Sequence, residues 1–356
     1  MKKLLIPAHL IIFTCLLYYN ASGQDNKGSK DKYTLLTMAY NQRPLLLYKG
    51  QLQINTSYKF AARTKSFDSE GNRISLKDEG SASMIHTYIY EIKYGITDFI
   101  ELGIDSYYLR NGIRSESGST LSGSYSITTN RLDEYKGMGD MTISAALRPP
   151  IEYRLFDFSL RGGITLPLAK YKPSEPSHSI TGYSSPNNFT INYQYNYKNG
   201  TGVSMYNISA AGKFTFSKIS LEARGIYRFP SAEGESIRWG WTRTGSSFTY
   251  YSTPYKYLPD RMLIINGSLH YQAAGWLDLF AGAWMSKYTS GWTEYYGNKY
   301  ANPEVSLLTL EPGFELQIAP SLTIYQYAGF QISGKNCDAP FYVLTTLSFN
   351  MFPFWK

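Results

Sequence analysis

The stretch that decides the fold is residues 206–229, which read YNISAAGKFTFSKISLEARGIYRF. Apolar and polar side chains alternate through both halves, on either side of residues 217–218. In the first half, for example, Ile208 and Phe214 fall on one face and Lys213 on the other. Successive side chains of a strand point to opposite faces, whereas a helix would scatter these polar groups around its circumference. The stretch therefore predicts an antiparallel hairpin with one apolar face and one polar face.

The same period of two recurs along the chain and predicts twelve strands in all. They are residues 51–63, 84–96, 100–109, 138–148, 156–166, 206–216, 219–229, 263–273, 277–285, 308–318, 322–332 and 341–352. Short links follow the even-numbered strands and long polar links follow most of the odd-numbered ones. Outer-membrane barrels have tight periplasmic turns and long outer loops, and a soluble sandwich, the alternative, would not sort its links this way. The pattern predicts an all-β, transmembrane, antiparallel up-and-down β-barrel of about 12 strands with both termini periplasmic.

Composition agrees with such a barrel and excludes other classes. The chain has 356 residues, of which 43% are hydrophobic and 17% charged, and it contains 33 Tyr and 2 Cys. That hydrophobic content excludes intrinsic disorder, and two cysteines exclude a disulfide scaffold. The formal net charge of +8 is modest and dispersed, so we expect no nucleic-acid partner. After residue 23 no apolar run approaches the 18 or more residues of a membrane-spanning helix.

The first residues resemble an export signal. Lys2 and Lys3 precede an apolar stretch over residues 4–19, and a small-x-small cleavage site at residues 21–23 follows. We therefore expect residues 1–23 to be a signal peptide, residues 24–46 an N-terminal periplasmic or plug segment, and residues 47–356 the outer-membrane β-barrel. The aromatic-rich end, residues 347–356, resembles the last strand recognised by the barrel-assembly machinery, although Lys356 follows the final aromatic residue.

Two segments carry a family resemblance. Residues 94–104, YGITDFIELGI, resemble a hairpin of the outer-membrane transporter-like family named for the meta-pathway of phenol degradation. Residues 137–141, GMGDM, resemble the Gly-x-Gly-Asp opening of a later strand in that family. The resemblance implies a barrel distantly related to channels for long-chain fatty acids and aromatic hydrocarbons, and it transfers no binding residue. Read as local structure, residues 95–98 of the first segment are a tight turn, and Gly137 and Gly139 relieve crowding where a strand leaves a loop.

The polar strand faces predict a lumen lined by charges of both signs. Such a mixture favours cross-strand ion pairs around water over an ion-selective ring, although Arg224 and Arg228, four residues apart on one face, could favour anionic solutes. Twelve strands make a pore narrower than that of a 16-stranded porin. The predicted pore-lining residues are Lys59, Arg63, Glu91, Lys93, Glu101, Asp105, Asp140, Arg148, Arg161, Lys213, Glu222, Arg224, Arg228, Glu311 and Glu315.

The function predicted from these observations is passive passage of small solutes across the outer membrane, with hydrophobic or aromatic solutes indicated by the resemblance. We expect outer-membrane lipid as a partner, and no cofactor, metal or enzymatic activity. One alternative is an outer-membrane hydrolase, for which His270, with Ser268 and Asn266 on the same face, is the partial constellation. Another is a surface-binding structural barrel, suggested by the Trp/Tyr-rich segments around residues 239–241 and 250–251.

Overall fold

The computed structural model describes residues 45–76, 82–121, 125–149, 155–169, 179–185, 188–194, 200–244, 247–295, 297–319 and 321–351. Within these ranges no helix is long and apolar enough to cross a membrane. The expected signal peptide, most of the expected plug segment and the terminal aromatic residues lie outside the described residues.

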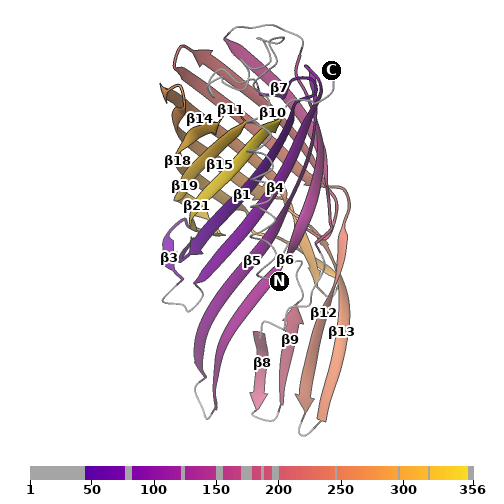
Figure 1. The fold of residues 1–356 in the computed structure, drawn as a ribbon. Helices are drawn as coiled ribbons and strands as arrows, with labels where there is room; N and C mark the ends of the chain where they lie inside the picture. Colours follow the sequence, from indigo (N-terminus) through magenta and orange to yellow (C-terminus); the bar gives the residue numbers. More distant parts are fainter. Residues whose placement is uncertain are drawn as a thin grey trace, which may run out of the picture. The chain divides into compact units, whose positions relative to one another are not determined.

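Twelve strands form a closed antiparallel barrel, which is visible in Figure 1 as a ring of tilted ribbons. In chain order they are β1 (Leu52–Arg63), β4 (Ser83–Thr97), β5 (Ile100–Leu121), β6 (Tyr125–Leu147), β7 (Phe156–Leu166), β10 (Met205–Phe216), β11 (Ile219–Pro230), β14 (Arg261–Ala274), β15 (Leu277–Thr289), β18 (Val305–Ala319), β19 (Leu322–Lys335) and β21 (Phe341–Met351). Each pairs with its neighbour in this order, and β1 pairs with β21 to close the ring. All twelve predicted strands are confirmed, and residue 352 of the last one lies outside the described residues.

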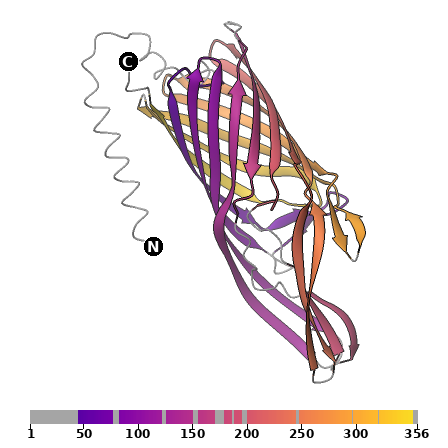
Figure 2. The same cartoon turned by 90° about the vertical axis from the view of Figure 1, so that its right-hand side faces the viewer.

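The long links differ from the prediction, because they contain strands of their own. Some form a six-stranded sheet of β8 (Ser179–Ser185), β9 (Asn188–Gln194), β12 (Gly234–Thr244), β13 (Ser247–Leu258), β16 (Trp292–Tyr295) and β17 (Asn298–Ala301). Others form a three-stranded sheet of β2 (Lys65–Phe67), β3 (Arg73–Ser75) and β20 (Cys337–Asp338). Pairing of β5 with β6 also continues to Leu121, well past the predicted strand end at residue 109 (Figure 2).

The barrel is apolar outside and polar inside, the reverse of a water-soluble protein. On β10 and β11, Ile208 is 56% exposed and Leu221 53%, whereas Lys213 is 4% exposed and Ser220 fully buried. Exposed large hydrophobic side chains recur on the other barrel strands. A closed barrel satisfies every backbone hydrogen-bonding group within the ring, so its outer face can contact hydrocarbon. The alternation read from residues 206–229 therefore places apolar side chains on the outer wall.

Gly139 and Asp68 each have a definite local role. The register between β5 and β6 shifts between Ser106 and Tyr108, and the ring of Tyr107 lies over Gly139, where an added Cβ would be 2.1 Å from the ring. Gly139 therefore relieves crowding, as predicted, but it lies inside β6, beside the register shift, and not where the strand leaves a loop, because β6 begins at Tyr125. At the β2–β3 turn, the Asp68 carboxylate accepts hydrogen bonds from the backbone N–H groups of Glu70 and Asn72, both at 2.8 Å. These bonds close a surface turn.

Candidate functional site

The candidate site is the barrel interior. The predicted pore-lining residues lie on the polar face of the barrel strands. Fourteen of the fifteen lie within barrel strands, and Arg148 directly follows β6. Several are nearly inaccessible: Glu101, Asp140, Lys213 and Glu315 are all buried. Strand alternation keeps them on the face opposite the exposed apolar side chains. Their role as pore-lining residues stays a prediction, but the structure gives their contacts.

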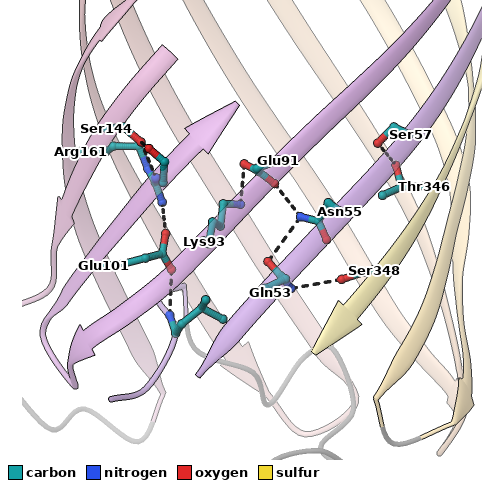
Figure 3. Close-up of polar contacts among 12 residues, drawn as sticks. Gln53, Asn55, Ser57, Glu91, Lys93, Glu101, Ser144, Arg161, Thr346 and Ser348 are labelled. Carbon is teal, nitrogen blue, oxygen red and sulfur yellow. Dashed lines mark hydrogen bonds and ion pairs between the residues drawn. The ribbon is translucent and has the colours of Figure 1, made fainter. Parts of the chain in front are cut away.

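The polar ladder on the inner wall consists of two networks, one from β7 to β5 and one from β4 to β21 (Figure 3). The Arg161 guanidinium pairs with the buried Glu101 carboxylate and donates to Ser144 Oγ at 3.0 Å. Lys93 Nζ lies 2.8 Å from Glu91 Oε1, whose second oxygen accepts from Asn55 Nδ2 at 2.6 Å. Gln53 then donates to Asn350 Oδ1 at 3.0 Å and to Ser348 Oγ at 3.2 Å. The Arg161–Glu101 pair and the bonds of Asn55 and Gln53 cross between strands, which is the arrangement predicted from the mixed charges, whereas the Lys93–Glu91 pair lies within β4.

The two arginines expected to favour anions have different partners. The Arg224 Nη2 atom lies 3.4 Å from Glu222 Oε1, and the Arg224 side chain is half exposed. Arg228 Nε donates to Asn207 Oδ1 at 2.7 Å, and its Nη2 donates to Thr165 Oγ1 at 3.2 Å. Lys213 lies in register between Asp157 and Glu222. Because Glu222 lies beside Arg224, the carboxylate partly neutralises the positive charge that Arg224 would present to a solute.

Other predicted residues hold the ends of the barrel together. Arg63 pairs with Asp338 of β20 at 2.8 Å, and Arg148 Nη2 donates to the Asp98 carbonyl at 2.7 Å. Asp140 accepts backbone N–H bonds from Ala169 at 3.2 Å and from Thr201 at 2.9 Å. It thereby ties down both ends of the link between β7 and β10. Asp105 and Glu315 lie in register with Glu91 and with the buried Asp278, respectively.

The N-terminal end of the described chain, residues 45–50, is bound at the barrel end that carries the short turns. Alternate backbone N–H groups donate to three carboxylates: Leu45 to Asp157 at 2.6 Å, Leu47 to Glu101 at 2.9 Å, and Lys49 to Asp98 at 3.0 Å. Leu46 is 2% exposed. A Cβ on Gly95 would lie 2.0 Å from the Tyr48 carbonyl oxygen, so the glycine of the YGITDFIELGI hairpin leaves room for this segment.

An aromatic group in the interior was missed by the sequence reading. We define the lumenal aromatic cluster as Phe280, Trp284, Tyr327 and Tyr342, from β15, β19 and β21. Phe280 and Tyr327 have ring centroids 6.1 Å apart, and Tyr327 and Tyr342 are 6.4 Å apart. Phe280 and Trp284 share the polar face of their strand with residues such as Gly282 and Ser286. This position could have indicated from the sequence that the two rings face the interior.

Glu311 joins this cluster to the charged residues. Its Oε1 accepts a hydrogen bond from Trp284 Nε1 at 2.8 Å and another from the Tyr342 hydroxyl. Lys59 Nζ lies 3.8 Å from the centroid of the Tyr342 ring, a cation–π distance. The cluster therefore carries its aromatic rings beside one ammonium group and one carboxylate.

Two residues of the possible hydrolase site, Ser268 and His270, are in contact. Ser268 Oγ and His270 Nε2 lie 3.0 Å apart, and Phe280 stacks on the imidazole with centroids 5.2 Å apart. His270 is 6% exposed. A nucleophile and a base within hydrogen-bond reach are two members of a catalytic site, which also needs an orienting group and an approach for the substrate.

The architecture is that of a closed, antiparallel, twelve-stranded β-barrel. No family model matches the chain, and no curated protein matches it. Among solved structures, an outer-membrane channel from Pseudomonas putida F1 superposes with a TM-score of 0.60 at 12% identity, covering 86% of this chain and 97% of that one. Two mutants of the monoaromatic hydrocarbon channel TodX each superpose with a TM-score of 0.51 at 10% identity, covering 86% of this chain and 91% of theirs. At these identities the likeness shows a shared fold.

Proposed function

We propose that the chain is an outer-membrane channel that passes small hydrophobic or aromatic solutes passively. The observation that carries the proposal is the closed twelve-stranded barrel with exposed apolar side chains outside and charged side chains inside. An apolar outer wall suits lipid, and a polar lumen suits a water-filled path. The solved structures of similar fold include channels for monoaromatic hydrocarbons, which supports the solute class. The relation to the family of the phenol meta-pathway stays a prediction.

The chain organisation fits this function. We infer that residues 1–23 direct export and that residues 47–356 form the barrel, inserted by the barrel-assembly machinery. Residues 24–46 would narrow the periplasmic end, because the adjoining residues 45–50 are held there by Asp98, Glu101 and Asp157. Extracellular placement of the long links would leave both termini in the periplasm.

We infer that the predicted pore-lining residues have different roles. Glu91, Lys93, Glu101 and Arg161 carry the polar ladder, so we infer that they maintain the wall. Asp140 and Arg63 fasten links at the ends of the strands. Among the described residues, Lys59 contacts an aromatic ring and Arg228 contacts an amide and a hydroxyl oxygen, and neither forms an ion pair with a carboxylate. We infer that a solute would meet these two side chains as cations.

A hydrolase is the second candidate, favoured by the contact between Ser268 and His270. The deciding experiment is conductance of the purified full chain in planar bilayers, combined with a lipid-hydrolysis assay. Stable conductance, together with swelling of liposomes in small aromatic solutes, supports the channel. A sealed bilayer with hydrolysis that disappears in Ser268→Ala would instead establish the enzyme. A sealed bilayer without hydrolysis would leave the structural barrel.

A further inference from the structure

We propose that the lumenal aromatic cluster and Lys59 form a binding site for an aromatic carboxylate. The ring of the solute would lie against the aromatic side chains, and its carboxylate would meet the Lys59 ammonium. The inference rests on the proposed channel function and narrows its solute class.

The aromatic cluster offers ring surfaces and few polar atoms. The planes of Phe280 and Tyr327 meet at 65°, and those of Tyr327 and Tyr342 at 77°, so neighbouring rings are edge to face. Aromatic pairs favour this geometry, and another aromatic ring can extend it. The Trp284 N–H and the Tyr342 hydroxyl are both directed to Glu311. Their polar ends are thereby occupied. Tyr342 itself is 2% exposed, so the ring surface left for a solute is that of the partly exposed Phe280, Trp284 and Tyr327.

Glycines in the wall make room for these rings. A Cβ on Gly313 would lie 2.6 Å from Phe280 Cζ and from Tyr327 Cβ. A Cβ on Gly329 would lie 2.1 Å from Tyr342 Cζ. Real Cβ atoms do not approach other heavy atoms so closely, so side chains at either position would displace the rings. The rings of the cluster therefore pack directly against the backbone of the wall at Gly313 and Gly329.

Lys59 supplies the charge that an anion would meet. Among the described side chains, no carboxylate lies within 4.0 Å of its ammonium, in contrast to Lys93 and Arg161. The neighbouring carboxylate, Glu311, already accepts two hydrogen bonds from Trp284 and Tyr342. The ammonium instead lies over the Tyr342 ring. A charge held among rings gains from a directly bound counterion, because few waters can solvate it.

An aromatic carboxylate uses both parts of the site. A hydrocarbon would contact the rings and leave Lys59 without a counterion, and a short aliphatic acid would pair with Lys59 and leave the rings uncovered. The combined contacts predict that benzoate binds more tightly than benzyl alcohol, which has the ring without the charge, and than acetate, which has the charge without the ring.

The test is calorimetric titration of the purified full chain in detergent with benzoate, benzyl alcohol and acetate. We expect Lys59→Gln to weaken benzoate binding about tenfold or more, because it removes one partner of a charge pair with little water around it. Lys59→Arg should restore most of the affinity, and benzyl alcohol binding should not depend on residue 59. The matched control is Lys218→Gln, since Lys218 lies in the exposed β10–β11 turn. Phe280→Leu should weaken benzoate and benzyl alcohol together.

Two results would overturn the site: benzoate binding no tighter than acetate binding, or equal benzoate affinity in wild type and Lys59→Gln. Circular dichroism of each variant confirms that the barrel has formed. Bilayer conductance separates this inference from the proposed function. A conducting chain that does not bind benzoate retains the channel and loses the site, whereas a sealed chain with benzoate binding that depends on Lys59 retains the site and loses the channel.

Discussion

Tyr342 lies flat against Gly329 on the inner wall, close enough that a Cβ on the glycine would be 2.1 Å from the tyrosine Cζ. The two residues belong to the neighbouring strands β19 and β21 and are paired in register. In this position the Tyr342 hydroxyl reaches Glu311 and its ring reaches Lys59. The absence of a side chain on one strand therefore sets the position of an aromatic ring on the next.

Replacing Gly329 should displace that ring. In Gly329→Val the branched side chain occupies the space of the Tyr342 ring, and overpacking of this kind costs about 1 to 3 kcal/mol. We expect a lower unfolding midpoint in urea and loss of benzoate binding. Gly225→Val is the matched control, because an added Cβ there meets no atom within 4 Å. Equal effects of the two substitutions would show that the close contact between Tyr342 and Gly329 has no consequence.

Breaking the buried ion pair should destabilise the barrel. Glu101 is 1% exposed and pairs with Arg161, so Glu101→Gln leaves a lumenal guanidinium without its counterion. Removing one partner of a buried pair costs about 3 to 5 kcal/mol, and the partial exposure of Arg161 favours the lower part of that range. Urea unfolding in detergent measures the change. Glu233→Gln, which alters an exposed ion pair with Lys299, should cost less than about 1 kcal/mol.

Releasing residues 45–50 should widen the barrel end that carries the short turns. The double variant Asp98→Ala, Asp157→Ala removes the acceptors for the N–H groups of Lys49 and Leu45 while leaving Glu101 and its ion pair in place. We expect higher single-channel conductance and faster proteolysis near residue 45. If conductance and cleavage match those of the wild type, this segment does not restrict the path.

The β2–β3 turn should resist acid. Hydrogen bonds from the backbone and side chain of Asn72 hold the pKa of the Asp68 carboxyl below its ordinary value. A carboxyl with a lowered pKa in the folded state stabilises its turn above the ordinary pKa of about 3.9, and that contribution is lost as the pH falls through the lower folded value. An NMR titration of the Asn72 amide should therefore have its midpoint below about 3.9. A midpoint at or above that value would contradict these hydrogen bonds.

The barrel could be predicted from the sequence because its two faces meet different solvents. Each spanning strand has lipid on one side and a polar interior on the other. Apolar side chains such as Ile208 therefore alternate with polar ones such as Lys213 along the sequence. The strands of the long links have no such constraint. Pairing of β12 with β13, for example, joins Trp239 to Ser252 and Arg238 to Thr253 without an obligatory apolar face. Those segments were read as loops.

The candidate site was only partly predictable for a related reason. Alternation assigns Lys59 and Glu311 to the interior, but it does not specify which charges pair across the strands. That depends on register, which brings Arg161 to Glu101 across β6. The role of Gly329 and Gly313 depends on rings from adjacent strands, and a single sequence does not reveal which strand positions are neighbours.

The most direct test of the account is cysteine accessibility along β10 during conductance recordings, in a Cys337→Ser background. A charged, membrane-impermeant thiol reagent should reduce the conductance of Ser209→Cys, on the inner face, and leave that of Ile208→Cys, on the lipid face, unchanged. Alternation of the effect along the strand would establish a water-filled path inside an apolar wall. A reagent effect at Ile208→Cys as large as that at Ser209→Cys, or no conductance in the unmodified chain, would contradict it.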